Sequence, residues 1–117
     1  GGVMAIHMIG SGMKDLPFDR TFFNVTLGDL IEQNGKELGY KLRLYLLDGT
    51  ILEVCRIDKL AEPYLVMRTY MGQEEACETS VNLVPYSLIY RIELSPRGVE
   101  GGGRMGFHWA PLTTNDR

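Results

Sequence analysis

One stretch constrains the fold of this chain more than any other: LRLYLLDGTILEVCRID, which runs from Leu42 to Asp58. Leucines occupy every second position at its start, the period-two pattern of a strand with one buried face: Leu42, Leu44 and Leu46. Asp48-Gly49 follows, and this pair tolerates the positive backbone angles that tight hairpin turns require. A second apolar alternation, with Leu52 and Val54 on one side, begins after the turn. The stretch therefore predicts a β-hairpin.

Length and charge limit what can be built around this hairpin. The 117 residues fit one domain, and 44% hydrophobic with 23% charged residues is typical of a globular protein. The net charge of −3 gives no overall attraction to nucleic acid or to an anionic membrane, so such binding would need a local patch or a symmetric ring. The chain has no long apolar run and no signal-peptide pattern at its start, so we expect no membrane partner and a cytoplasmic location.

The segment before the hairpin predicts an arm and a helix. Residues 1–21 are dotted with glycine and aperiodic, and we expect a flexible arm or vector-derived residues. Thr26 can cap a helix over about 27–34, in which Leu27, Leu30 and Ile31 share a face. A strand through TFFNVTL is the alternative, because its apolar residues also alternate.

The segment after the hairpin predicts three more strands and a tail. PYLVMRTY (63–70) reads as a strand, MGQEEACETS (71–80) as an acidic loop, and VNLVPYSLIYRIEL (81–94) as a closing pair broken at Pro85. Residues 97–117 are glycine-rich and predict a flexible tail. We therefore expect a mainly β domain over 22–96, with a short N-terminal helix followed by a strongly bent, five-stranded antiparallel barrel.

No combination of residues in this sequence predicts catalysis. Cys55 and Cys77 could form a disulfide or half of a metal site, but we interpret them as a small buried side chain and a free exposed thiol. His7 and His108 lack metal-ligand spacing, and no nucleophile in the predicted core has a nearby base. Residues 101–106 match GxGxxG without the strand and helix that a dinucleotide site needs. We expect no enzyme, no cofactor, no metal and no small-molecule substrate.

The order of the predicted elements resembles the Sm/LSm family, most closely its bacterial Hfq branch. LRLYLLDGTILEV is similar to the first Sm motif, and VNLVPYSLIYRIEL is similar to the second. In the second motif, Val84-Pro85-Tyr86-Ser87 stands where Hfq proteins usually carry a valine followed by Tyr-Lys-His. The likeness covers about residues 26–95. It implies an Sm-like barrel that assembles into a homo-oligomeric ring of about five to seven subunits.

The resemblance also implies a binding site for single-stranded RNA. In an Sm ring, two loops of each subunit face the pore and hold a base by stacking and polar contacts. Here those loops would supply Lys59, Tyr64, Tyr86 and Ser87, and the expected ligand is rich in U or A. A packing role is the alternative for both tyrosines.

The closing strand carries the oligomer interface that the resemblance implies. It would pair with the next subunit through Leu88, Tyr90 and Ile92. The alternative is a structural or assembly ring module, including a phage-related one, that has lost the RNA pocket. Two observations keep this alternative open: the Hfq Lys-His pair is missing, and residues 42–96 hold five Lys and Arg against eight Asp and Glu.

Overall fold

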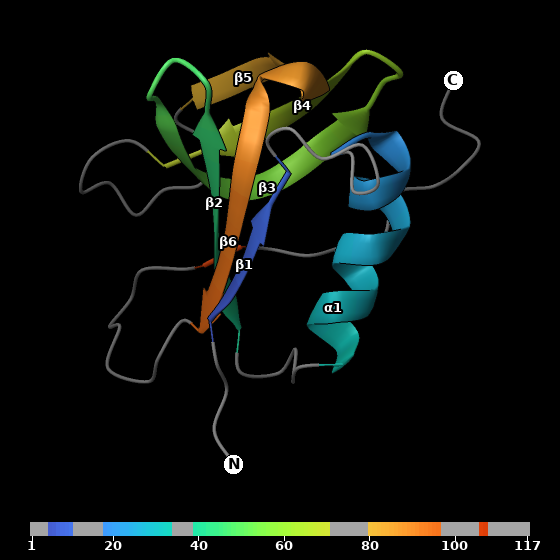
Figure 1. Cartoon of the computed structure of the whole chain (residues 1–117), viewed down its shortest axis with the longest axis vertical. Coiled ribbons are helices and arrows are strands. Elements are labelled where there is room, and N and C mark those ends of the chain that lie inside the picture. The colour runs from blue at the N-terminus through green and yellow to red at the C-terminus, as the bar shows by residue number, and fades with distance from the viewer. Residues whose placement is uncertain (1–4, 11–17, 34–38, 71–79, 97–105, 108–117) are drawn as a thin grey trace.

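The computed structural model describes residues 5–10, 18–33, 39–70, 80–96 and 106–107, and its strands form one antiparallel sheet. The strand order is β1-β6-β2-β3-β4-β5 (Figure 1). The elements are β1 (Ile6–Ile9), the π-helical turn η1 (Phe22–Thr26), α1 (Leu27–Gln33), β2 (Tyr40–Leu46), β3 (Ile51–Leu60), β4 (Tyr64–Thr69), β5 (Ser80–Pro85), the 3₁₀ helix η3 (Tyr86–Leu88) and β6 (Ile89–Pro96). A mainly β fold with one short α-helix is therefore confirmed.

The predicted hairpin is formed by β2 and β3. Leu42, Leu44 and Leu46 are all buried, as their alternation requires. At the turn Gly49 has a φ of +93°, a conformation that favours glycine, and the Thr50 N–H donates to Asp48 Oδ1 at 2.9 Å. This backbone hydrogen bond lowers the pKa of Asp48.

The predicted helix is present, and the alternative strand through TFFNVTL is wrong. Helical backbone extends upstream of α1 through η1, so Thr26 lies inside the helical segment and does not cap it. The cap is Asp19, whose Oδ1 accepts the Phe22 N–H at 2.9 Å. The helix is not the first element of the chain, because β1 precedes it.

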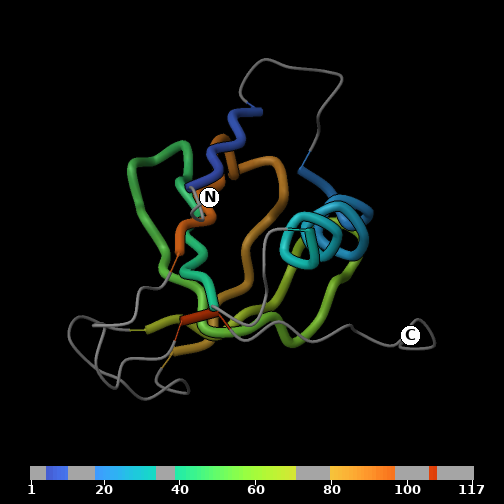
Figure 2. The backbone as a smooth tube through the Cα atoms, turned by 90° about the horizontal axis from the view of Figure 1, so that it is seen from below, coloured from blue at the N-terminus to red at the C-terminus, as the bar shows by residue number. Residues whose placement is uncertain are grey.

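Figure 2 shows the helical segment beside the curved sheet. Buried side chains of both belong to one core cluster. Six aliphatic or thioether side chains of the sheet have no exposed surface, and each such burial stabilises the fold by about 1.5–3 kcal/mol: Leu42, Leu44, Leu65, Met67, Ile92 and Leu94. The helical segment contributes Phe22, Phe23, Leu27 and Ile31 to the same cluster.

The predicted five-stranded barrel is wrong: the described strands form an open sheet of six, because part of the expected arm forms the additional strand β1. β1 pairs with β6, with Ile6 opposite Leu94 and Ile9 opposite Arg91. The ladder continues through the Gly10 N–H, which donates to the carbonyl oxygen of Tyr90 at 2.9 Å. The prediction of a flexible arm is therefore wrong for Ile6–Ile9.

Part of the predicted tail also belongs to the core. The Phe107 side chain is only 9% exposed, and its N–H donates to the carbonyl oxygen of Tyr40 at 2.6 Å. The Tyr70 hydroxyl donates to the carbonyl oxygen of Gly106 at 2.8 Å. A tail that is flexible throughout is thus wrong at Gly106 and Phe107, and the rest of it, His108 included, lies outside the described residues.

Cys55 is not the free side chain that the sequence suggests. It is fully buried in β3 and disulfide-bonded. The chain has one other cysteine, Cys77, which lies with the predicted acidic loop 71–79 outside the described residues. The prediction of a small, unbonded core cysteine is therefore wrong for Cys55.

Candidate functional site

Two connections that are distant in sequence meet at one end of the sheet. Ala61–Pro63 joins β3 to β4, and η3 joins β5 to β6. The Tyr86 N–H donates to the carbonyl oxygen of Pro63 at 3.3 Å, and the Tyr86 hydroxyl donates to that of Ala61 at 2.7 Å. We call residues 59–64 and 85–87 the loop end. It brings together the two loops in which the resemblance implies a binding site.

Tyr86 is a packing residue at the loop end. Its side chain is 7% exposed, and its ring lies 5.9 Å from that of Phe23, centroid to centroid. Burial raises the pKa of Tyr86 to about 12. The prediction that Tyr86 offers its ring to a base is therefore contradicted, because both the ring and the hydroxyl are engaged within the chain.

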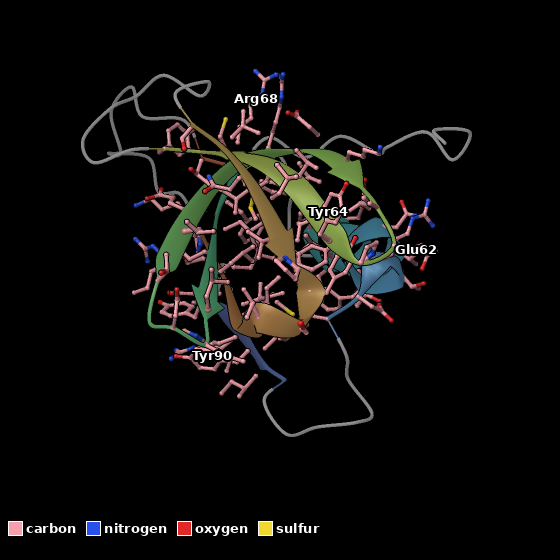
Figure 3. All side chains as sticks on the ribbon, turned by 90° about the horizontal axis from the view of Figure 1, so that it is seen from above. Glu62, Tyr64, Arg68 and Tyr90 are labelled. Carbon is pink, nitrogen blue, oxygen red and sulfur yellow. The ribbon has the colours of Figure 1, made fainter. Side chains whose placement is uncertain are left out.

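The other three predicted binding residues reach the surface. Tyr64 is half-buried at the start of β4, while Lys59 and Ser87 are exposed. Figure 3 shows Glu62 and Tyr64 together on the side of the molecule where the helical segment lies. The loop end thus presents one accessible aromatic ring, one hydroxyl, one cation and one carboxylate.

The start of the helical segment adds charged groups that the sequence did not predict. The Arg20 Nε–H donates to the carbonyl oxygen of Leu60 at 3.0 Å, which holds the arginine beside the loop end. Asp19 lies close enough to raise the pKa of Tyr86, as does Glu62, whereas Arg20 lowers it. With Lys59 and Arg20 against Asp19 and Glu62, the loop end has no excess of positive charge.

A second polar cluster lies on the outer face of β1, β6 and β2. The Tyr45 hydroxyl donates to Glu93 Oε1 at 2.7 Å, and Arg43 Nη1 lies 3.6 Å from the same oxygen. The Tyr45 hydrogen bond lowers the pKa of Glu93 and raises that of Tyr45. Arg91 lies over the Tyr45 ring at 4.9 Å and donates from Nη2 to His7 Nδ1 at 2.9 Å. This network ties β1 to its neighbour β6 and, through Arg91, to β2.

Charged residues of β3 and β4 form a third cluster. Asp58 Oδ1 accepts from Arg56 Nε at 3.1 Å, and Oδ2 accepts from Arg68 Nε at 2.9 Å. Arg56 and Arg68 are cross-strand partners, so the carboxylate separates two guanidinium groups that would otherwise repel each other. The shared carboxylate therefore links the side chains of the two strands.

The predicted oligomer interface does not match the structure. Ile92 is fully buried, with Met8 of β1 opposite it on one side and Leu44 of β2 on the other. The Tyr90 carbonyl accepts the Gly10 N–H, and the Leu88 carbonyl accepts the Leu47 N–H at 2.8 Å. Both edges of β6 are therefore paired within the chain.

Two further features concern residues 5–10, 18–33, 39–70, 80–96 and 106–107, the part of the chain that the structure describes. In these ranges no group of three or more His, Cys, Asp or Glu side chains could hold a metal ion. The helices in these ranges are too short to cross a membrane.

Comparison with known proteins adds no relative. This chain matches no protein-family model, no curated protein and no solved structure. The candidate function therefore depends on the sequence and the geometry of the chain itself.

Proposed function

We propose that residues 22–96 form a divergent Sm-like domain. The support is the order β6-β2-β3-β4-β5, in which the last strand lies beside the first of the five and a short helix precedes them all. The hairpin with its Asp-Gly turn and the 3₁₀ helix between β5 and β6 occupy the positions of the two motifs that resemble the family. β1 is an addition to this five-stranded unit.

The domain would act without catalysis, by binding single-stranded RNA rich in U or A at the loop end of a homo-oligomer. The observation that carries this proposal is the contact between the Ala61–Pro63 connection and η3. It brings the segments that carry Lys59, Tyr64 and Ser87 to the same end of the sheet, where a base could stack on the tyrosine while polar groups contact its edge.

The charges of the loop end set the strength of binding. One stacking ring contributes about 1–3 kcal/mol per base, so loss of Tyr64 should weaken binding about ten-fold or more. Because positive and negative side chains balance there, few counterions are released. The affinity should therefore fall less steeply with salt than that of a basic groove.

Fluorescence anisotropy with labelled oligo(U) and oligo(A) at low salt tests this proposal. Tyr64→Ala is the test variant, and Tyr90→Ala is the matched control, because Tyr90 is also half-buried and lies away from the loop end (Figure 3). We expect weaker binding by Tyr64→Ala and unchanged binding by Tyr90→Ala. Equal affinities for both variants, or no binding by the parent protein, would overturn the proposal.

A structural or assembly module is the second candidate. It is favoured by the two edge strands of the sheet, β1 and β5, which carry no Asp, Glu, Lys or Arg. Purified protein whose absorbance shows no nucleic acid, and which binds neither oligonucleotide but still forms oligomers, would support this candidate over RNA binding.

A further inference from the structure

Charged side chains are distributed across this sheet in the reverse of the usual pattern. Natural proteins place charges, especially lysine, on edge strands, because an open edge otherwise pairs with another chain. Here the Asp, Glu, Lys and Arg residues of the sheet all lie on its four inner strands: Lys41, Arg43, Glu53, Arg56, Asp58, Lys59, Arg68, Arg91 and Glu93. The edge strands β1 and β5 have none.

The edge at β5 is apolar as well as uncharged. Val81 and Leu83 are 56% and 60% exposed, and they lie on the outer face because Val84, one position on, is buried. In the register with β4, Leu83 stands opposite Val66. Only Pro85, at the end of the strand, lacks a backbone N–H. Within the described residues β5 pairs with β4 alone, so its other side can accept a strand.

The opposite edge strand, β1, also exposes a large apolar side chain. Ile9 is 53% exposed and begins a cross-strand row that passes through Arg91 and Tyr45 to Ile51, which is 55% exposed. Leu47 is also exposed, at the hairpin that ends this side of the sheet. Large apolar side chains are therefore exposed on both edge strands, two on β5 and one on β1, whereas Ile51 lies on the inner strand β3.

We propose that β5 of one copy pairs with β1 of the next, which joins copies head to tail into a continuous sheet. The inference rests on the proposed homo-oligomer and is independent of RNA binding. Two different open edges on one chain define a heterologous interface, which closes into a ring or continues as a filament. β6 cannot serve as the acceptor while β1 covers it, so β1 replaces β6 as the interface strand.

A second copy is the occupant that fits both edges. A single strand of a different protein would cover either β5 or β1 and leave the other edge open. When copies pair with one another, the same β5–β1 contact is repeated around the assembly. In a closed ring, both edges of every copy are then covered. It also places Val81 and Leu83 of one copy beside Ile9 of its neighbour, so that apolar groups meet.

Two lysine variants test the interface by complementation. Leu83→Lys blocks the β5 edge and leaves β1 intact, while Ile9→Lys blocks the β1 edge and leaves β5 intact. Both side chains are more than half exposed, so folding should be preserved, and circular dichroism melts check this. Val25→Lys, on η1, is the matched control, because Val25 is 49% exposed and lies outside the sheet.

Native mass spectrometry at tens of micromolar, without RNA, gives the readout. We expect oligomers for the parent protein and for Val25→Lys, and single copies for each edge variant alone. An equimolar mixture of Leu83→Lys and Ile9→Lys should give pairs and nothing larger, because only one intact β5–β1 contact can form.

Each other result overturns the proposal in a distinct way. Oligomers of Ile9→Lys alone would mean that β5 pairs with itself or with β6. Single copies in the mixture would exclude a heterologous contact between these edges. A monomeric parent protein would remove both this interface and the proposed homo-oligomer, whereas loss of RNA binding with intact oligomers would remove only the RNA proposal.

Discussion

Substitution of Tyr86 separates a packing role from a ligand-binding role. Tyr86→Ala removes a ring that is 7% exposed and packed against Phe23, and truncation of a buried aromatic side chain costs about 3–5 kcal/mol. Tyr86→Phe keeps the ring and removes the 2.7 Å hydrogen bond to the carbonyl of Ala61, which should cost about 1 kcal/mol. Tyr64→Ala, at a half-buried position of the same loop end, should cost less than Tyr86→Ala by at least about 2 kcal/mol.

Urea unfolding followed by far-UV circular dichroism measures these differences. The urea midpoint of Tyr86→Ala should be lower than that of Tyr64→Ala. The slopes of both unfolding transitions should stay unchanged, because the folded state keeps its compactness. If Tyr86→Ala were no more destabilising than Tyr64→Ala, the Tyr86 ring would lie outside the core, and a stacking role for it would return.

High pH gives a second readout of the same side chain. The folded-state pKa of Tyr86 is raised to about 12 from an ordinary value of 10, so its contribution to stability is complete below pH 10. This contribution, at most about 2–3 kcal/mol, is lost as the pH rises from 10 towards 12. Tyr86→Phe should therefore show a shallower loss of stability over that range, and an unchanged slope would contradict the burial of the hydroxyl.

Three further predictions concern the turn, the tail and the outer face. Gly49→Ala should destabilise the fold by about 1 kcal/mol in thermal melts through its φ of +93° alone, because an added Cβ would meet nothing within 4 Å; an unchanged melt would show that the turn relaxes. Phe107→Ala should cost about 3–5 kcal/mol in urea unfolding, and a loss below about 1 kcal/mol would place this side chain outside the core. Because the pKa of Glu93 is lowered, its ionised carboxylate stabilises the fold at pH values above the ordinary carboxyl pKa. This stabilisation is lost as the pH falls through the lowered pKa. Tyr45→Phe should flatten this acid dependence of the urea midpoint, and an identical acid limb would argue against the hydrogen bond.

Local patterns predicted the hairpin and the inner face of the sheet because those features depend on neighbouring residues. The alternation of Leu42, Leu44 and Leu46 requires one buried face, and Gly49 permits the turn. The helix was also predictable in position. Its cap was missed, because Asp19 lies before five residues of π-helical turn that the capping pattern at Thr26 does not anticipate.

The remaining features depend on contacts between distant segments. β1 has only four residues, and its two inward-facing side chains, Ile6 and Met8, are too few to give a clear alternation. Phe107 is buried by contact with the core, which nothing in its glycine-rich surroundings indicates. The sequence predicts the connection between β5 and β6 that carries Tyr86. The burial of the Tyr86 ring, however, depends on Phe23, which is far away in the sequence.

Amide hydrogen exchange at increasing protein concentration tests the edge-to-edge assembly most directly. If β5 of one copy pairs with β1 of the next, exchange in Ser80–Pro85 and in Ile6–Ile9 should slow together as the concentration rises, because new interchain hydrogen bonds protect their amides. Exchange in α1, which lies outside the sheet, should stay constant and serves as the internal control. Rates in both edge strands that do not depend on concentration, under conditions where oligomers form, would contradict the account.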